Sequence, residues 1–203
     1  MYAVKVAQQS LRGRVLFWLT LCVLFSPTVL GQSAPLPRIA GLSNFHQVSP
    51  QLFRGAQPSK EAIEQLASMG VKSVINLRGT DEIAASEEKF VTGSGMRYFN
   101  VPLSGLKRPS PDAIEKILSL IDAPENQPAF VHCHYGADRT GMIVALYRIS
   151  RQGWTDDKAI DEARQFGLKF WEVGMKNYIH DFARDIATKP QPQTAPAATA
   201  TRQ

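Results

Sequence analysis

Hydrophobic and polar residues follow two different patterns between residues 45 and 187. Short runs rich in Val, Ile and Phe predict strands, and apolar residues spaced three or four apart predict amphipathic helices between them. Strands are predicted at residues 45–49, 51–55, 71–77, 96–102 and 128–132. Helices are predicted at residues 57–70, 80–95, 110–121, 140–153, 154–167 and 169–187. Strands and helices therefore alternate as far as residue 140, and only helices follow.

Capping residues support several of these helix boundaries. Ser59 and Thr155 lie where an N-cap is expected, and Ser110 precedes Pro111, which suits the first helical position. Because Gly174 falls inside the last apolar pattern, that helix is expected to be interrupted or kinked there. The alternation predicts an α/β fold with a central, mostly parallel sheet of about four to five strands, helices on both faces and a helical C-terminal half.

The first 31 residues differ from the rest of the chain. They contain no acidic residue, and their basic residues are Lys5, Arg12 and Arg14. An unbroken apolar run follows, and Val29 and Gly31 are small residues of the kind found before a signal-peptidase site. We expect a signal peptide at residues 1–31 and an exported protein, either periplasmic or secreted. The alternative is an uncleaved membrane anchor, although the run from Val15 to Leu30 is shorter than the ~20 residues of a spanning helix.

Composition divides the remainder of the chain into three parts. Residues 32–42 are rich in proline and are expected to form a linker. Residues 189–203 consist mainly of Pro, Ala, Thr and Gln without apolar periodicity, so a disordered tail is expected. Residues 43–188 then form one globular domain, which suits a chain of 203 residues that is 44% hydrophobic.

Charge and cysteine content narrow the range of functions. The net charge is +5, and removal of the three positive charges of residues 1–31 leaves +2. No basic stripe interleaved with aromatic residues is present, so we expect no nucleic-acid partner. Cleavage would also remove Cys22 and leave Cys133 without a disulfide partner. Cys133 is therefore either an inert buried thiol or a reactive one.

The segment "PAFVHCHYGADRTG", residues 128–141, carries the strongest chemical signal. A predicted strand ends at His132, Cys133 follows, Arg139 comes six residues later, and a helix is expected from Thr140. Ligands of open α/β sheets bind beyond the carboxyl ends of the strands, where this loop must lie. A loop that leads into a helix N-terminus directs backbone N–H groups and positive potential toward an anion.

The residue types within this loop suit phosphate chemistry. Backbone N–H groups and a helix N-terminus stabilise a thiolate at Cys133. The planar guanidinium of Arg139 matches two phosphate oxygens, Gly136 permits a tight turn, and the hydroxyl of Thr140 can donate a hydrogen bond to the sulfur. Together they predict attack of Cys133 on a phosphate monoester and a cysteinyl-phosphate intermediate. The alternative is a buried structural cysteine.

"VHCHYGADRTG" resembles the signature loop of the cysteine-dependent protein tyrosine and dual-specificity phosphatases, His-Cys-x5-Arg-Thr-Gly. Segments on either side resemble small exported bacterial dual-specificity-like enzymes, and the resemblance covers about residues 43–170. It implies a phosphatase-like fold in which residues 43–188 are the catalytic domain. The implied roles are nucleophile for Cys133, phosphate binding for Arg139, thiolate partner for Thr140 and support of the loop for His132. The substrate phosphate would be bound by His134, Tyr135, Gly136, Ala137, Asp138 and Arg139.

The position of the general acid departs from the family pattern. The family usually has an aspartate on the loop after the preceding strand, but here that loop reads "PLSGLKRPSP" and has no acid. Asp138, directly before Arg139, is our candidate for the acid, since myotubularin-like and some bacterial phosphatases resemble this chain in having Asp-Arg there. Asp112, at the start of the following helix, is the second candidate. Asp138 can instead orient loop amides or Arg139.

The loop side chains bear on the substrate. Bacterial relatives that favour phosphoinositides tend to have lysine at the position of Ala137, so a phosphotyrosine-like monoester is favoured and a phosphoinositide or inositol polyphosphate is the alternative. Lys107 and Arg108 can bind a second phosphate or form an ordinary solvated pair. Tyr135 can stack on an aryl substrate or form a wall of the pocket.

Other classes of function fit the sequence less well. The "HCH" triplet offers metal ligands, but adjacent residues at a strand end point to alternate sides, and neither His46 nor His180 has a suitable spacing. We expect no metal and no cofactor. A phosphate-binding pseudophosphatase and a sulfur-transfer protein remain as alternatives. The expected protein is a monomer without membrane insertion after signal cleavage, and its partner is a phosphorylated protein or small phosphomonoester substrate.

Overall fold

A computed structural model describes residues 38–105, 107–169 and 172–188 of the chain. The expected signal peptide at 1–31 and the expected tail at 189–203 lie outside these residues. No helix within the described ranges combines the length and apolarity needed to cross a membrane.

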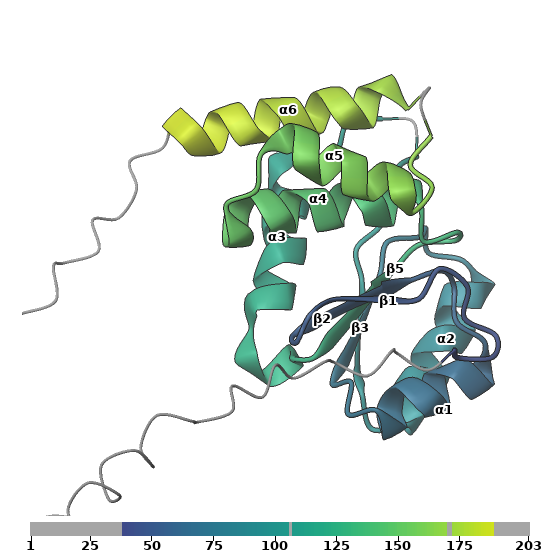
Figure 1. The fold of residues 1–203 in the computed structure, drawn as a ribbon. Coiled ribbons are helices and arrows are strands. Elements are labelled where there is room, and N and C mark those ends of the chain that lie inside the picture. The colour runs from purple at the N-terminus through teal and green to yellow at the C-terminus, as the bar shows by residue number, and fades with distance from the viewer. Residues whose placement is uncertain (1–37, 106, 170–171, 189–203) are drawn as a thin grey trace, which may run out of the picture. The chain divides into compact units, whose positions relative to one another are not determined.

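A five-stranded sheet forms the centre of the fold (Figure 1). Its strands are β1 (His46–Ser49), β2 (Leu52–Gly55), β3 (Ser73–Asn76), β4 (Arg97–Asn100) and β5 (Ala129–His132). The spatial order is β1-β2-β5-β3-β4, in which only β1 runs antiparallel to its neighbour. The predicted mostly parallel sheet is thus confirmed, with β5 at its middle.

Helices cover both faces of this sheet, as predicted (Figure 1). They are α1 (Lys60–Ser68), α2 (Glu82–Gly93), α3 (Pro111–Asp122), α4 (Asp138–Gln152), α5 (Asp156–Gln165) and α6 (Val173–Thr188), with a 3-10 turn, η1, at Pro124–Asn126. Phe130 of β5 packs with α1 and α2, whereas its neighbour Val131 packs with α3 to α6. This alternation along one strand divides the interior into two apolar cores.

The predicted caps are present at three helix starts. Ser59, Ser110 and Thr155 each accept a hydrogen bond from the backbone N–H three residues later, at 3.2, 3.2 and 3.3 Å. Two predicted boundaries were wrong. Helix α4 begins at Asp138 rather than Thr140, and α6 begins at Val173, so Gly174 lies in its first turn and no kink in mid-helix occurs.

The packed domain begins earlier than the expected boundary at residue 43. Ile39 and Leu42 are buried in the core that contains Phe53 and Phe130. The backbone N–H of Ser59 also donates to the carbonyl of Gly41 at 3.1 Å. The linker expected at residues 32–42 therefore ends earlier than predicted, and residues from Ile39 onward belong to the domain.

Candidate active site

The loop from Cys133 to Arg139 lies at the carboxyl end of β5, between the ends of β2 and β3 (Figure 1). Cys133 is 3% exposed, and α4 begins only five residues after it. The loop was expected at this edge of the sheet, and the structure brings Cys133 and the start of α4 together there. The thiol therefore lies at the base of a loop that ends in a helix N-terminus.

Gly136 allows the loop to pack tightly on β2. Its φ of +67° is in the left-handed region, and a Cβ placed there would lie 2.4 Å from the carbonyl carbon of Gly55 and 2.6 Å from the nitrogen of Ala56. Both neighbours are backbone atoms that a side chain cannot push aside. Glycine is therefore required at this position for conformation and for space.

The carbonyl groups of the loop are hydrogen-bonded on its outer side. The carbonyl of His134 accepts from the backbone N–H of Gln57 at 3.1 Å. The side-chain amide of Asn44 donates to the carbonyls of Tyr135 and Gly136, at 3.4 and 3.0 Å. Because the C=O and N–H of a trans peptide point in opposite directions, these bonds turn the following N–H groups inward.

The N–H groups of the loop have no acceptor among the residues that the structure describes. Those of residues 134–140 donate none of the hydrogen bonds found between described residues. The last three belong to the first turn of α4, whose N–H groups have no partner within the helix. Loop and helix together present a concentration of N–H donors suited to an anion with several oxygens.

Arg139 and Thr140 occupy the helical end of the loop. Arg139 donates from Nη1 to the carbonyl of Leu77, at the end of β3, at 3.4 Å, and it forms no ion pair with a carboxylate in the described ranges. Thr140 is fully buried, yet its hydroxyl oxygen has no hydrogen-bond partner within the part of the chain described. The predicted bond to the sulfur of Cys133 is therefore not formed here.

The two candidate acids lie in different surroundings. Asp138 is partly buried in the first turn of α4, and its Oδ1 accepts from the backbone N–H of Lys169 at 3.1 Å. Asp112 is exposed in the first turn of α3. Asp138 therefore belongs to the loop, as predicted, and it joins the loop to the segment after α5. Between described residues, no hydrogen bond or ion pair connects Asp112 to the loop.

His132 connects the loop to a buried polar network. Its Nδ1 lies 3.2 Å from the carbonyl of Cys133, and its Nε2 lies 2.9 Å from Oε1 of Glu87, a carboxylate buried in α2. The other oxygen of Glu87 accepts from the side-chain amide of Asn76 at 2.7 Å. Tyr98 also contacts this network, and burial raises the pKa of its phenol. His132 thus has a buried partner, Glu87, that was not identified from the sequence.

Arg54 is a second residue that the sequence analysis missed. It lies on β2, is completely buried, and donates from Nη2 to the carbonyl of Gly136 at 2.6 Å. Its guanidinium stacks on the ring of Phe166 with 4.3 Å to the centroid. Loss of hydration on burial lowers the pKa of Arg54 to about 10. A charged residue within the buried strand "LFRG" is the sequence signal that would have identified it.

The outer rim of the loop is aromatic. His134 and Tyr135 are exposed, and their rings meet edge to face with 4.3 Å between centroids. Tyr135 is 67% exposed, so it does not wall an enclosed pocket. Ala137 is buried, at 9% exposure. The two rings therefore present an aromatic surface beside the loop.

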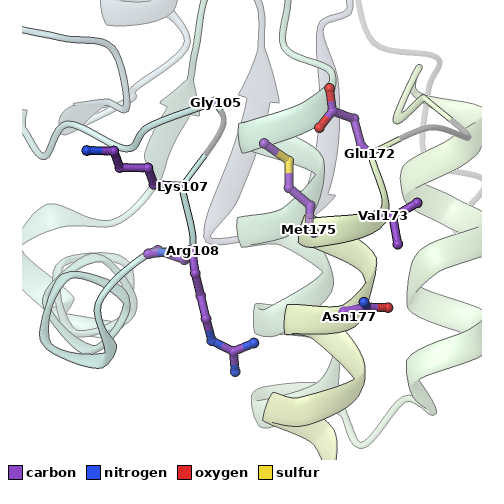
Figure 2. A pocket seen from close by; sticks show the side chains of 9 residues that line it. Gly105, Lys107, Arg108, Glu172, Val173, Met175 and Asn177 are labelled. Atoms are coloured by element: carbon purple, nitrogen blue, oxygen red, sulfur yellow. The ribbon is translucent and has the colours of Figure 1, made fainter.

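A pocket of about 340 Å³ lies between residues 105–109 and the beginning of α6 (Figure 2). Lys107 and Arg108 line it on one side, and Glu172 and Met175 line it on the other. Arg108 is already paired with Asp181 of α6 at 2.7 Å. Lys107 forms no ion pair with a carboxylate in the described ranges, and both side chains are exposed, so a site for a second phosphate and an ordinary solvated pair both stay predictions.

Residues 39–180 match a family described as a DSP-PTPase phosphatase fused to NAD+ kinase. The dual specificity protein phosphatase TpbA of Pseudomonas aeruginosa is 27% identical over 125 residues, which cover 62% of this chain and 55% of the relative. The inositol diphosphatase SIW14 of Saccharomyces cerevisiae is 29% identical over 130 residues, which cover 62% of this chain and 46% of the relative. The chain thus spans about half the length of these relatives.

Solved structures of the same two proteins share the fold. The catalytic core of SIW14 in complex with citrate has a TM-score of 0.65 at 24% identity, over 74% of this chain and 91% of that one. A serine variant of TpbA in complex with phosphotyrosine has a TM-score of 0.62 at 23% identity, over 77% of this chain and 96% of that one. These similarities confirm the predicted phosphatase-like α/β fold.

Proposed function

The chain belongs to the DSP-PTPase phosphatase family, and from this membership we propose that it hydrolyses phosphate monoesters with Cys133 as the nucleophile. The observation that carries the proposal is that the N–H groups of residues 134–140 donate no hydrogen bond to any described residue, while the buried thiol of Cys133 begins the same loop. Such donors bind the oxygens of a phosphate dianion and remain bonded to them as charge develops in the transition state. A buried structural cysteine requires no such arrangement.

The reaction follows from these positions. The thiolate of Cys133 attacks phosphorus, an S–P bond forms, and the P–O bond to the leaving group breaks. Arg139 forms no ion pair with a carboxylate among the described residues, and its planar guanidinium binds two of the phosphate oxygens. Water then attacks phosphorus, the S–P bond breaks, and inorganic phosphate leaves with the thiolate restored. The other product is the alcohol or phenol.

Asp138 is the proposed general acid. It lies in the first turn of α4 next to Arg139, and among the described residues only its Oδ1 accepts a hydrogen bond, from the N–H of Lys169. Its other oxygen is left to carry the proton that the leaving oxygen receives, and the same group then takes a proton from the attacking water. Asp112, exposed on α3, has no comparable link to the loop through any described residue.

A leaving-group comparison tests this role. We expect Asp138→Asn to lower kcat for phenyl phosphate on the order of 100-fold, and to lower kcat for p-nitrophenyl phosphate much less, because nitrophenolate leaves without a proton. Asp112→Asn serves as the matched control and should leave both rates unchanged. Equal turnover of phenyl phosphate by wild type and Asp138→Asn would exclude Asp138 as the acid.

Phosphotyrosine is the proposed substrate class, with dual specificity toward protein substrates as in the relative TpbA. The exposed rings of Tyr135 and His134 support it, because they can pack against the ring of a phosphotyrosine whose phosphate lies in the loop. Inositol polyphosphates or diphosphates are the second candidate. The pocket beside Lys107 favours them, and SIW14 is named an inositol diphosphatase.

Hydrolysis of p-nitrophenyl phosphate by wild type and Cys133→Ser tests the reaction itself. We expect activity in the wild type and background activity in the variant; absence of activity in both would favour a phosphate-binding pseudophosphatase. A panel of phosphotyrosine peptides, phosphoserine peptides, phosphoinositides and inositol polyphosphates then tests the substrate. Lys107→Ala should lower kcat/KM for inositol polyphosphates alone, if these are substrates.

We also propose that the protein acts after export, as a monomer. The basic and apolar segments of residues 1–31 support export. Fractionation of cells that express the full chain, with mass spectrometry of the mature N-terminus, tests the site of action and cleavage after Gly31. Light scattering of the purified protein tests the monomeric state.

A further inference from the structure

Arg54 is a buried cation without a counter-ion. It is fully buried on β2, and among the described residues it forms no ion pair. Its Nε and Nη1 have no hydrogen-bond partner in that part of the chain, and its one hydrogen bond is from Nη2 to the carbonyl of Gly136. The ring of Phe166 stacks on the guanidinium, but a buried charge without a counter-ion is costly, so a purely structural explanation is weak.

The sheet places Arg54 directly beneath the active-site loop. In the parallel pairing of β2 with β5, Arg54 is opposite Val131, and side chains alternate between the two faces along each strand. Leu52, two residues before Arg54, and Val131 and Cys133 all pack in the core beneath α4. The guanidinium therefore lies on the same face of the sheet as the thiol.

The bond from Arg54 to Gly136 determines how the loop presents one of its donors. The carbonyl of Gly136 is held from outside by Arg54 at 2.6 Å and by Asn44 at 3.0 Å. Because that peptide is trans, the N–H of Ala137 must point to the opposite side, into the loop. Arg54 thus stabilises the peptide orientation that an anion requires.

The charge of Arg54 is not cancelled by its surroundings. The ionisable groups that act on it are Cys133, Glu162, Arg148 and His46. Glu162 is the nearby carboxylate, but both of its oxygens accept hydrogen bonds from Arg148, at 2.6 and 3.0 Å. The remaining anion that this cation can stabilise is the one at the loop, either the thiolate or a bound phosphate.

We propose that Arg54 is a positioning residue of the active site, which orients the Gly136–Ala137 peptide toward the bound phosphate and stabilises the anionic thiol through its uncompensated charge. This inference rests on the proposed phosphatase function. Its tests use thiol reactivity and phosphate binding, so it can fail or succeed independently of turnover.

The first test measures the rate of Cys133 alkylation by iodoacetamide against pH. Arg54→Met removes the charge but keeps an unbranched side chain, and we expect it to move the midpoint of the profile upward by about one pH unit. Arg54→Lys keeps the charge and should keep the midpoint within about 0.3 of a unit of the wild type. A Met variant with the wild-type midpoint, or a Lys variant shifted as far as the Met variant, would overturn the electrostatic part.

The second test measures binding of inorganic phosphate by calorimetry, with Cys133→Ser as the background so that no reaction occurs. Adding Arg54→Met should weaken phosphate binding at least about tenfold, since one charge and one oriented donor are lost. Adding Arg54→Lys should weaken it less, because the charge remains. Equal phosphate affinity with and without Arg54→Met would overturn the proposal.

Arg148→Met/Glu162→Gln is the matched control, because it removes another buried arginine together with the carboxylate that neutralises it, so no carboxylate is freed to act on Arg54. Where this variant remains folded by circular dichroism, its alkylation midpoint and phosphate affinity should equal those of the wild type. If Arg54→Met does not fold, Arg54→Lys decides: a wild-type midpoint supports the proposal, and a shift of a full unit in a folded protein contradicts it. A wild type that hydrolyses no ester but shows these shifts would refute the proposed function alone.

Discussion

Arg54 and Arg148 are both buried arginines, but their environments are opposite. Arg148 on α4 donates two hydrogen bonds to Glu162, at 2.6 and 3.0 Å, and further bonds to Gln152 and to the carbonyl of Val48. Among the described residues, Arg54 on β2 has one hydrogen bond and no ion pair with a carboxylate. Arg148 joins α4 to α5 and β1. The charge of Arg54, in contrast, can act on the loop above it.

The difference shows how a structural cation can be separated from a functional one. Burial lowers the pKa of Arg54 from 12.5 to about 10, which corresponds to a cost on the order of 3 kcal/mol for the charged form. At neutral pH the guanidinium is still charged. Strongly perturbed groups cluster at functional sites. The buried, unpaired charge of Arg54 is therefore better explained by a role at the active-site loop than by a contribution to stability.

Removing the paired arginine should have the largest effect on stability. Arg148→Met leaves the partly buried carboxylate of Glu162 without this partner, so we expect the free energy of unfolding to fall by about 3 kcal/mol in urea denaturation. The double variant Arg148→Met/Glu162→Gln should recover most of this loss, because no charge is left uncompensated. A loss below about 1 kcal/mol in the single variant would show that the pair contributes little.

Gly136→Ala should have the next largest effect, since it disrupts the partner of Arg54 without removing the charge. The added Cβ would meet the backbone of Gly55 at 2.4 Å and force the loop away from β2. We expect a loss of about 2–3 kcal/mol in unfolding free energy and a fall in kcat/KM of at least about 100-fold. Gly174→Ala is the control, because a Cβ at Gly174 meets no atom within 4 Å. Wild-type kcat/KM in Gly136→Ala would contradict a tightly held loop.

Asn44 shares the carbonyl of Gly136 with Arg54, and its removal should have an intermediate effect. Asn44→Gly deletes three side-chain bonds, to Tyr135, Gly136 and Phe166, while keeping the positive φ of 55° accessible. We expect kcat/KM to fall about tenfold. The double variant with Arg54→Met should be non-additive, because both residues hold the same peptide. Strict additivity in this cycle would show that they act separately.

Local signals in the sequence were sufficient to predict most of the helices and strands of the fold. Helix starts were predicted because Ser59, Ser110 and Thr155 act on backbone within three residues of themselves. The loop was predicted because the spacing of Cys133 and Arg139 is itself local. The start of the packed domain, by contrast, was predicted too late because proline content concealed it.

Long-range contacts account for what could not be predicted at the site. Arg54 and Gly136 are 82 residues apart in the chain, and Asn44 and Gly136 are 92 apart. Glu87 lies in a helix whose sequence gives no reason for a buried acid, and its contacts with His132, Asn76 and Tyr98 explain its burial. Residues of this kind support the loop from other elements, so a pattern within one segment cannot identify them.

The smallest predicted effect is a pH dependence that belongs to Arg54. Its pKa is lower in the folded protein, about 10 against 12.5, so above pH 10 the native state loses this proton more readily than the unfolded chain does. The contribution of Arg54 to the free energy of unfolding must therefore rise with pH in that window, because at this group the unfolded state binds more protons. We expect the unfolding free energy of wild type minus that of Arg54→Met to increase by about 0.5–1 kcal/mol between pH 8 and pH 10.5.

Arg54→Met is the necessary reference for this measurement of unfolding free energy against pH. Burial raises the pKa of Tyr98 and that of Tyr178 in the folded protein, so each contributes stability that is lost as pH rises. Both tyrosines are present in wild type and in Arg54→Met, so their contributions cancel in the difference. A difference that stays constant or decreases up to pH 10.5 would mean that Arg54 is better compensated in the fold than its contacts indicate. The contrast with Arg148 would then lie in hydrogen bonding alone and not in charge.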